Sequence, residues 1–216
     1  MIYRYGDSWE KYPVQIGDLW VDKKIGSVVS VCDITRTLPE YMLAADMIYC
    51  DPPWSLGNVN CFYTKADHPD RIHYFSEFYS SFFSRVRQIH PKVCYVEIGK
   101  QNRDEFLFQM QAIFPDIREW KITYYKKNPC FLIRGGHERW QKCDFTGMDD
   151  INTPFAAIHE ESVQVVADLC TGQGLTAVAA FRLGKSFVGT ELNRRRLAVA
   201  IDRVNKLGGN YARSVS

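Results

Sequence analysis

The stretch Val165-Val166-Ala167-Asp168-Leu169-Cys170-Thr171-Gly172-Gln173-Gly174-Leu175-Thr176 decides the fold of this chain. It predicts an apolar strand, a Gly-x-Gly turn and then an alanine-rich helix over residues 177–183. Residues 185–191 predict a second strand ending in Glu191, which follows Asp168 at close to the ~20-residue spacing at which an acid meets ribose hydroxyls. A lone Gly-x-Gly indicates only a tight turn. The whole strand–turn–helix–strand–acid unit indicates a ligand-binding turn like that of dinucleotide-binding folds.

A second motif lies upstream, where the apolar run Met47-Ile48-Tyr49-Cys50 leads into Asp51-Pro52-Pro53-Trp54. The run predicts a short buried strand, and the two prolines end it because neither can donate a backbone hydrogen bond. The Asp51 carboxylate and the Pro52 carbonyl can then point together as acceptors beside the Trp54 ring. That arrangement suits a planar ring with an exocyclic amino group, although a strand that ends in Pro-Pro is by itself ordinary loop punctuation.

The rest of the chain predicts alternating strands and helices. Strands are expected at residues 27–33, 93–99 and 120–125, and helices at 75–89 and 101–114. This alternation predicts the α/β class, with a doubly wound, mostly parallel sheet and helices on both faces, in one domain over residues 1–216. Ligands of such sheets bind beyond the carboxyl ends of the strands, where Asp51, Asp168 and Glu191 all fall.

Asp51-Pro52-Pro53-Trp54 resembles the catalytic motif of amino-directed, S-adenosylmethionine-dependent methyltransferases, in which Asp-Pro-Pro-Tyr or Asp-Pro-Pro-Trp marks N6-adenine enzymes. The unit from Val165 to Glu191 resembles the cofactor site of Rossmann-like methyltransferases. Because the catalytic motif comes first, the chain is similar to the permuted, β-type amino methyltransferases. The likeness covers most of residues 27–205, with a catalytic half at 27–150 and a cofactor-binding half at 151–205.

The resemblance implies an N6-adenine methyltransferase that acts on DNA with S-adenosylmethionine as its cofactor. In a duplex the amino group is paired, so the base must be flipped out or met single-stranded. Residues 140–152 leave little room for a recognition region. We therefore expect low sequence specificity, or specificity supplied by a partner or by a second copy in a homodimer.

The resemblance also implies site residues. The catalytic set is Asp51, Pro52, Pro53 and Trp54. The cofactor-binding set is Asp33, Asp51, Asp168, Cys170, Gly172, Gly174, Thr176, Glu191, Leu192 and Asn193. Asp33 matches the acid nearest the cofactor's adenine in that family, although an ordinary strand-end aspartate fits equally well.

Substrate contacts are expected from aromatic and basic side chains. The substrate-binding set is Trp54, Tyr63, Lys65, Lys126, Lys127, Arg134, His137 and Arg139. Residues 55–70 predict a polar-aromatic loop over the base, or else an irregular surface loop. The basic cluster at 134–139 predicts phosphate contact, with a solvated loop as the alternative. Arg194, Arg195 and Arg196 are expected to face solvent.

Composition sets further bounds. The net charge is only +2, so nucleic-acid binding depends on local clusters. The seven cysteines show no metal-ligand spacing and are expected to be free, mostly buried thiols in a reducing compartment. Residues 1–12 do not resemble a signal peptide, and no segment approaches the length of a membrane span. We expect a cytoplasmic protein that needs no metal and binds no membrane.

Three alternatives remain open. The tryptophan form of the motif also resembles RNA adenosine methyltransferases, so RNA is an alternative partner. N4-cytosine in DNA is another target, although aspartate rather than serine at position 51 favours adenine. An inactive binding subunit with the same fold is the non-enzymatic alternative, and the two intact motifs argue against it.

Overall fold

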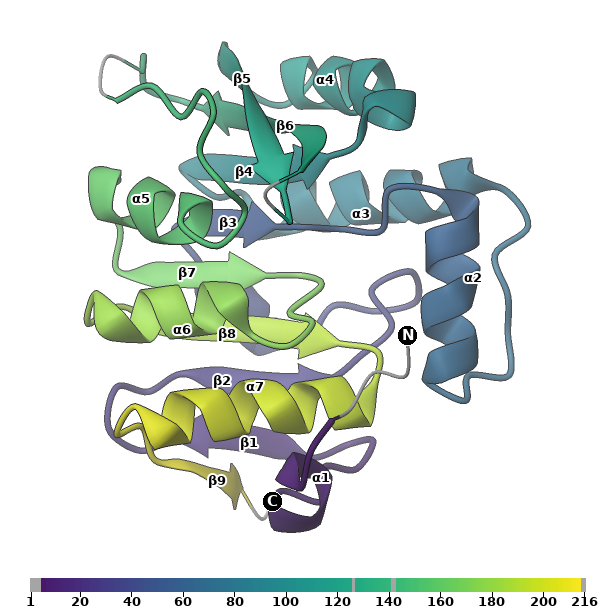
Figure 1. Cartoon of the computed structure of the whole chain (residues 1–216), viewed down its shortest axis with the longest axis vertical. Coiled ribbons are helices and arrows are strands. Elements are labelled where there is room, and N and C mark those ends of the chain that lie inside the picture. Colours follow the sequence, from purple (N-terminus) through teal and green to yellow (C-terminus); the bar gives the residue numbers. More distant parts are fainter. Residues whose placement is uncertain (1–4, 126, 141–142, 215–216) are drawn as a thin grey trace.

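The protein, seen as a computed structural model that describes residues 5–125, 127–140 and 143–214, is built on one large sheet (Figure 1). Within the described residues the strand order is β5-β6-β4-β3-β7-β8-β2-β1-β9. The strands are β1 (Leu19–Asp22), β2 (Val28–Val31), β3 (Met47–Cys50), β4 (Val93–Ile98), β5 (Asp116–Tyr124), β6 (Asn128–Gly136), β7 (Val165–Asp168), β8 (Ser186–Glu191) and β9 (Tyr211–Ser214). The central strands β4, β3, β7, β8 and β2 run parallel, and the strands at both edges pair antiparallel.

Helices cover both faces of the sheet. The α-helices are α1 (Ser8–Lys11), α2 (Leu56–Lys65), α3 (Phe75–Ile89), α4 (Arg103–Gln111), α5 (Thr153–Glu160), α6 (Leu175–Arg182) and α7 (Arg194–Lys206), and the 3-10 helices are η1 (Glu40–Ala44) and η2 (Lys100–Asn102). Helices α5, α6 and α7 pack on one face, and α3 and α4 pack on the other. The predicted doubly wound α/β fold is confirmed.

The two cores follow from the alternation of side chains along the strands. In β3, Met47 and Tyr49 enter one core, while Ile48 and Cys50 enter the other. Successive side chains of a strand point to opposite faces, so an uninterrupted apolar run needs cover on both sides. Helix α3 supplies part of that cover through residues at helical spacing, among them Phe78, Phe82 and Val86.

A crevice is expected between β3 and β7, which are neighbours in the sheet although they are far apart in the sequence. From β3 the chain passes through α2 and α3 to β4 on one side, and from β7 it passes through α6 to β8 on the other. At such a switch point the connections diverge and leave space beyond the carboxyl ends of the strands. Helix α2 stands across these ends (Figure 1).

Two segments differ from the sequence-based expectation. Residues 56–65, expected as a loop, form α2. Ser55 caps its amino end, where the Ser55 side chain accepts a hydrogen bond from the Asn58 amide. The basic cluster at 134–139, expected to contact phosphate or else to form a solvated loop, begins inside β6, which pairs antiparallel with both β4 and β5.

Candidate functional site

A cavity of about 550 Å³ lies beyond the carboxyl ends of the central strands. All of Asp51, Pro52, Pro53 and Trp54 line it, and so do Asp168, Gly172 and Glu191. Its volume is in the range of about 300–1,000 Å³ that small-molecule sites occupy. The two motifs therefore form the walls of one cavity.

Carboxyl groups gather along one side of this cavity, because each of the parallel strands carries an acid at or just beyond its carboxyl end. In the order of the sheet these acids are Glu97, Asp51, Asp168, Glu191 and Asp33, and all of them line the cavity. Such a row places acceptors around a ligand rich in amino and hydroxyl groups.

The Asp51 turn is held by Trp54. The indole Nε1 of Trp54 donates to Asp51 Oδ1 at 2.8 Å, and Asn102 Nδ2 donates to the Trp54 carbonyl at 2.7 Å. The Trp54 ring lies against Gly99 so closely that a Cβ there would stand 2.7 Å from Trp54 Cε3. The Tyr124 ring also packs against the Trp54 ring, with ring centroids 4.8 Å apart. These contacts fix one carboxylate oxygen and leave Oδ2 free of this bond.

Burial raises the pKa of Asp51 to about 7. The hydrogen bond from Trp54 and the charge of Arg196 lower this pKa, while the neighbouring carboxyl of Asp168 raises it. The Asp168 carboxyl itself has a pKa of about 6, again because of burial. Both groups can therefore change charge close to neutral pH.

The glycine turn after β7 is closed by two acids. Asp168 Oδ1 accepts from the Cys170 amide at 2.9 Å, and Glu191 Oε2 accepts from the Gly172 amide at 2.6 Å. Gly172 and Gly174 have φ of +57° and +80°, values that favour glycine. Gly174 also abuts α7, because a Cβ there would lie 2.6 Å from Ala200 Cβ.

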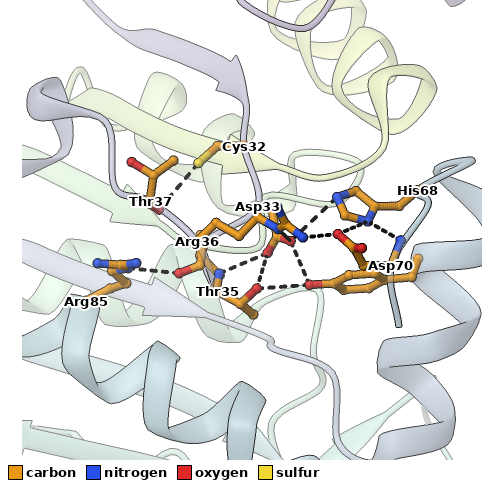
Figure 2. Close-up of polar contacts among 10 residues, drawn as sticks. Cys32, Asp33, Thr35, Arg36, Thr37, His68, Asp70 and Arg85 are labelled. Atoms are coloured by element: carbon orange, nitrogen blue, oxygen red, sulfur yellow. Dashed lines mark hydrogen bonds and ion pairs between the residues drawn. The ribbon is translucent and has the colours of Figure 1, made fainter. Parts of the chain in front are cut away.

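The far end of the cavity is organised by Asp33, which lies at the centre of the contacts in Figure 2. The Thr35 amide and hydroxyl donate to Asp33 Oδ1 at 2.9 and 2.7 Å, and the Tyr63 hydroxyl donates to Oδ2 at 2.8 Å. Arg36 and His68 lie 3.8 and 3.7 Å from Oδ2. The network ties the β2 end to α2 and the segment after it.

Helix α2 is also joined to the start of α7. Asn193 Nδ2 donates to the Lys65 carbonyl at 2.7 Å, while Asn193 Oδ1 accepts from the amides of Arg195 and Arg196 at the start of α7. Lys65 Nζ lies 5.6 Å from the centre of the Phe62 ring and does not line the cavity. Lys65 thus marks the end of the covering helix.

The structure brings most of the other predicted residues to the cavity. Cys170, Thr176, Leu192, Asp33 and Tyr63 line it, whereas Gly174 and Asn193 shape the elements behind it. All seven cysteines are free thiols; Cys32, Cys50, Cys94 and Cys130 are buried. Among the described residues no group of His, Cys, Asp and Glu is placed to hold a metal ion. No helix of the described chain is long and apolar enough to cross a membrane.

The described basic residues that were proposed for phosphate contact do not line the cavity. Lys126 lies outside the described residues, and Lys127 is exposed and away from the cavity lining. Arg134 is only 3% exposed, and its guanidinium is paired with Asp116 of β5 and with Glu161, which follows α5. It pairs across the sheet with Tyr95, toward the amino end of β4, so the expected phosphate contact of Arg134 is corrected to a structural ion pair.

His137 and Arg139 follow β6 at the same end of the sheet. Both are exposed, and neither lines the cavity. The His137 ring packs near Phe114, with centroids 5.4 Å apart. Their position, at the opposite end of the strands from Asp51, does not support a contact with a ligand in the cavity.

Arg196, Tyr124 and Glu97 are among the cavity residues that the sequence did not assign to the site. Arg196, expected to face solvent, lines the cavity with its guanidinium carbon 4.7 Å from the centre of the Phe62 ring. Tyr124 lines it from β5. Glu97 lines it from β4 and is 2% exposed; an acid inside the apolar run 93–98 was the signal that could have identified it.

Comparison with known proteins gives matches at the level of structure. No protein-family model matches the chain, and no curated protein matches it. TTHA0409 of Thermus thermophilus, assigned as a DNA modification methylase, shares 15% identity with a TM-score of 0.58 over 82% of this chain and 94% of its own. The M1.HpyAVI–SAM complex shares 12% identity with a TM-score of 0.56 over 81% of this chain and 98% of its own. TTHA0409 complexed with S-adenosyl-L-methionine matches at a TM-score of 0.56 and 13% identity, over 82% of this chain and 94% of its own. The chain shares the fold of these proteins.

Proposed function

We propose that this protein is an S-adenosylmethionine-dependent methyltransferase whose target is the N6 amino group of adenine in DNA. One observation carries the proposal: the Asp51–Trp54 turn and the Gly172 turn with Glu191 line the same cavity at the switch point of the sheet. The first supplies acceptors and an aromatic ring for an amino-bearing base, and the second is the kind of turn that holds a nucleoside. The fold shared with TTHA0409 and M1.HpyAVI agrees with this assignment.

The residues of the cavity suit the cofactor. Glu191 uses its two oxygens to order the backbone of Gly172 and Asn193, and its remaining lone pairs suit the ribose hydroxyls. Asp33, at the far end, offers a carboxylate to an adenine amino group. Phe62, Leu192 and Ile34 add apolar surface for a ring. A Cβ at Gly172 would approach Arg196 to 2.7 Å, so glycine keeps this part of the cavity open.

The reaction needs a more nucleophilic nitrogen, because the lone pair of an exocyclic amino group is delocalised into the ring. When bound, the cofactor supplies an electrophilic methyl group on a sulfonium. Ionised Asp51 and the Pro52 carbonyl would accept the two N–H bonds and so favour a tetrahedral, electron-rich nitrogen in the transition state. Asp51 would then take up the proton that the methylated nitrogen loses.

Substrate access requires an unpaired base. A flipped or single-stranded base would reach Asp51 and lie beside the ring of Trp54. Among the described residues, the basic side chains that line the cavity are Arg196 and Arg203. Low sequence specificity follows, since few groups are placed to contact base edges or phosphates.

The test is methyl transfer from labelled S-adenosylmethionine to double-stranded DNA, single-stranded DNA and RNA, followed by nucleoside analysis. We expect N6-methyladenine in DNA. N4-methylcytosine, or methylated adenosine found only in RNA, would overturn the substrate assignment. The absence of transfer to every nucleic acid, with cofactor binding retained in calorimetry, would indicate an inactive binding subunit.

Asp51→Ala is the matched variant for this test. We expect it to lower turnover by at least about 10²-fold, because a preorganised acceptor of the transition state is lost. Cofactor affinity should change much less than turnover, since Glu191 and Asp33 hold the cofactor's ribose and adenine in this proposal. Turnover retained in the purified variant would contradict the role of Asp51.

A further inference from the structure

Glu97 lines the cavity, and the proposed reaction assigns no role to its carboxyl group. Cys50 pairs with Val96 in the parallel β3–β4 ladder, so the next residues along, Asp51 and Glu97, stand side by side at the strand ends. Tyr49 lies on the same face two positions before Asp51, and its hydroxyl donates to Glu97 Oε1. Glu97 thus belongs to the wall against which an amino-bearing base would lie.

One oxygen of Glu97 lacks a partner. Glu97 is 2% exposed, and among the described residues its Oε2 forms no hydrogen bond. A buried polar atom without a partner is costly, which makes such an atom a candidate for contact with a ligand. It lies beside the acceptor that the proposed reaction assigns to the amino group.

The protonation of Glu97 follows from its surroundings. Burial, and then the nearby charge of Asp51, raise the pKa of Glu97 well above its usual range. The acids Asp150 and Asp168 raise its pKa further, while the hydrogen bond from Tyr49 lowers it. Since Oε1 already accepts from Tyr49, the proton of the neutral acid belongs on Oε2, where it forms a free O–H donor.

We propose that Glu97 is a specificity-determining residue, whose Oε2–H donates to the ring nitrogen adjacent to the amino group of the base. This inference rests on the proposed function. Adenine and cytosine both carry an acceptor nitrogen next to the amino-bearing carbon, and Asp51 and Glu97 together match that pair: Asp51 accepts from the amino group and Glu97 donates to the ring. The cavity therefore selects an amino group with a neighbouring ring acceptor, rather than any amino group.

Base analogues test the contact without changing the protein. An oligonucleotide with 1-deazaadenine keeps the amino group and replaces the ring nitrogen by C–H; 3-deazacytosine does the same if the target is cytosine. For the wild type we expect kcat/KM to fall about tenfold or more on the analogue, as for the loss of one buried hydrogen bond. Oligonucleotide affinity, measured by fluorescence anisotropy with S-adenosylhomocysteine present, should fall in parallel.

Two variants separate recognition from a structural role. Glu97→Gln keeps an N–H donor of similar shape, so discrimination against the analogue should persist within about threefold. Glu97→Ala removes the donor, so the natural base and the analogue should become equivalent. Both variants are compared at equal folded fraction, judged from their unfolding curves.

The outcomes are distinguishable from those of the proposed function. If the wild type methylates the natural base and its deaza analogue equally well, the role of Glu97 is overturned while the methyltransferase assignment stands. Unchanged discrimination in Glu97→Ala overturns it as well. If no nucleic acid is methylated, the proposed function itself has failed.

Discussion

At the scale of single residues, Trp54 has two roles at the cavity, and the same contacts hold its ring in place for both. Its ring offers an aromatic face at the cavity, and its Nε1 holds Asp51 Oδ1. The ring is kept in place by Gly99 beneath it and by Tyr124 beside it. The orientation of the proposed catalytic carboxylate therefore depends on a glycine in the neighbouring strand's loop.

Gly99→Ala tests that dependence. The added Cβ would stand 2.7 Å from Trp54 Cε3, so the ring must move and its bond to Asp51 must weaken. We expect methyl transfer to fall by about 10-fold to 100-fold, with cofactor affinity nearly unchanged. Gly57→Ala is the control, because the nearest atom to its Cβ is Ser55 Oγ at an ordinary 3.8 Å. Equal activity of the two variants would contradict this role for Gly99.

The pH dependence of turnover tests the Asp51 carboxylate. Because the ionised form accepts the amino protons and the pKa of Asp51 is about 7, kcat/KM should rise with pH and level off above about 8. The hydrogen bond from Trp54 lowers this pKa, so Trp54→Phe should move the rising limb to higher pH. A pH–rate profile of the two proteins measures the shift; a limb that stays in place would contradict it.

At the scale of elements, the sequence predicted helices whose apolar residues recur at helical spacing and strands whose apolar runs end sharply. Helix 75–89 was predicted with the observed bounds, because its apolar residues keep helical spacing. Helix α2 was missed because Gly57, Asn58 and Asn60 have weak helix propensity, and its formation depends on the Ser55 cap and on tertiary contacts of Tyr63. The strand at 128–136 was missed because Pro129, Gly135 and Gly136 are typical of loops.

The residues of the candidate site likewise fall into those that the sequence could predict and those that it could not. Asp51, Asp168 and Glu191 could be predicted because each ends a strand, and strand ends meet at one edge of a parallel sheet. Arg196 could not, since a run of three arginines does not reveal which one points inward from the start of α7. Arg134 was misassigned because its buried partners, Asp116 and Glu161, are distant in the sequence.

The packing of α6 against α7 sets the glycine turn between β7 and α6. Gly174→Ala would place a Cβ 2.6 Å from Ala200 Cβ at a φ of +80°, so both strain and overlap arise. Gly184→Ala has a similar φ of +67° with nothing within 4 Å, and it reports the strain alone. We expect Gly184→Ala to cost about 1 kcal/mol and Gly174→Ala about 3 kcal/mol.

Thermal unfolding and cofactor titration of the two variants measure the difference. At about 2–4 °C per kcal/mol for a chain of this size, Gly174→Ala should melt several degrees below Gly184→Ala. It should also bind cofactor more weakly, because the turn that carries Gly172 has moved. Equal melting temperatures would show that the α6–α7 contact does not constrain the turn.

At the scale of the whole molecule, the row of strand-end acids lines the cavity with carboxyl groups, and their burial lowers the stability of the folded protein at neutral pH. Asp51, Glu97 and Asp168 are buried within one cavity wall, and burial raises the pKa of each. A raised pKa in the folded state means that folding takes up protons, so ionising these groups at neutral pH opposes folding. These carboxyl groups thus lower the stability of the folded protein when they ionise, at a position where a bound ligand would form hydrogen bonds with them.

The unfolding temperature of the ligand-free protein should therefore fall as pH rises from about 5 to 8. Below its unfolded value of 3.8, Asp168 is protonated in both states and its stabilising contribution is complete; that contribution is lost as pH rises through about 6, and that of Asp51 as pH rises through about 7. Against the effect of burial, Asp46 and Asp202 have pKa values lowered from 3.8 by their lysine and other hydrogen-bond partners, so both stay ionised across this window and do not contribute to the decline. Asp51→Asn, which cannot ionise, should flatten the upper part of the decline, and differential scanning calorimetry across this range measures it. A decline of unchanged slope in Asp51→Asn would locate the titrating group elsewhere.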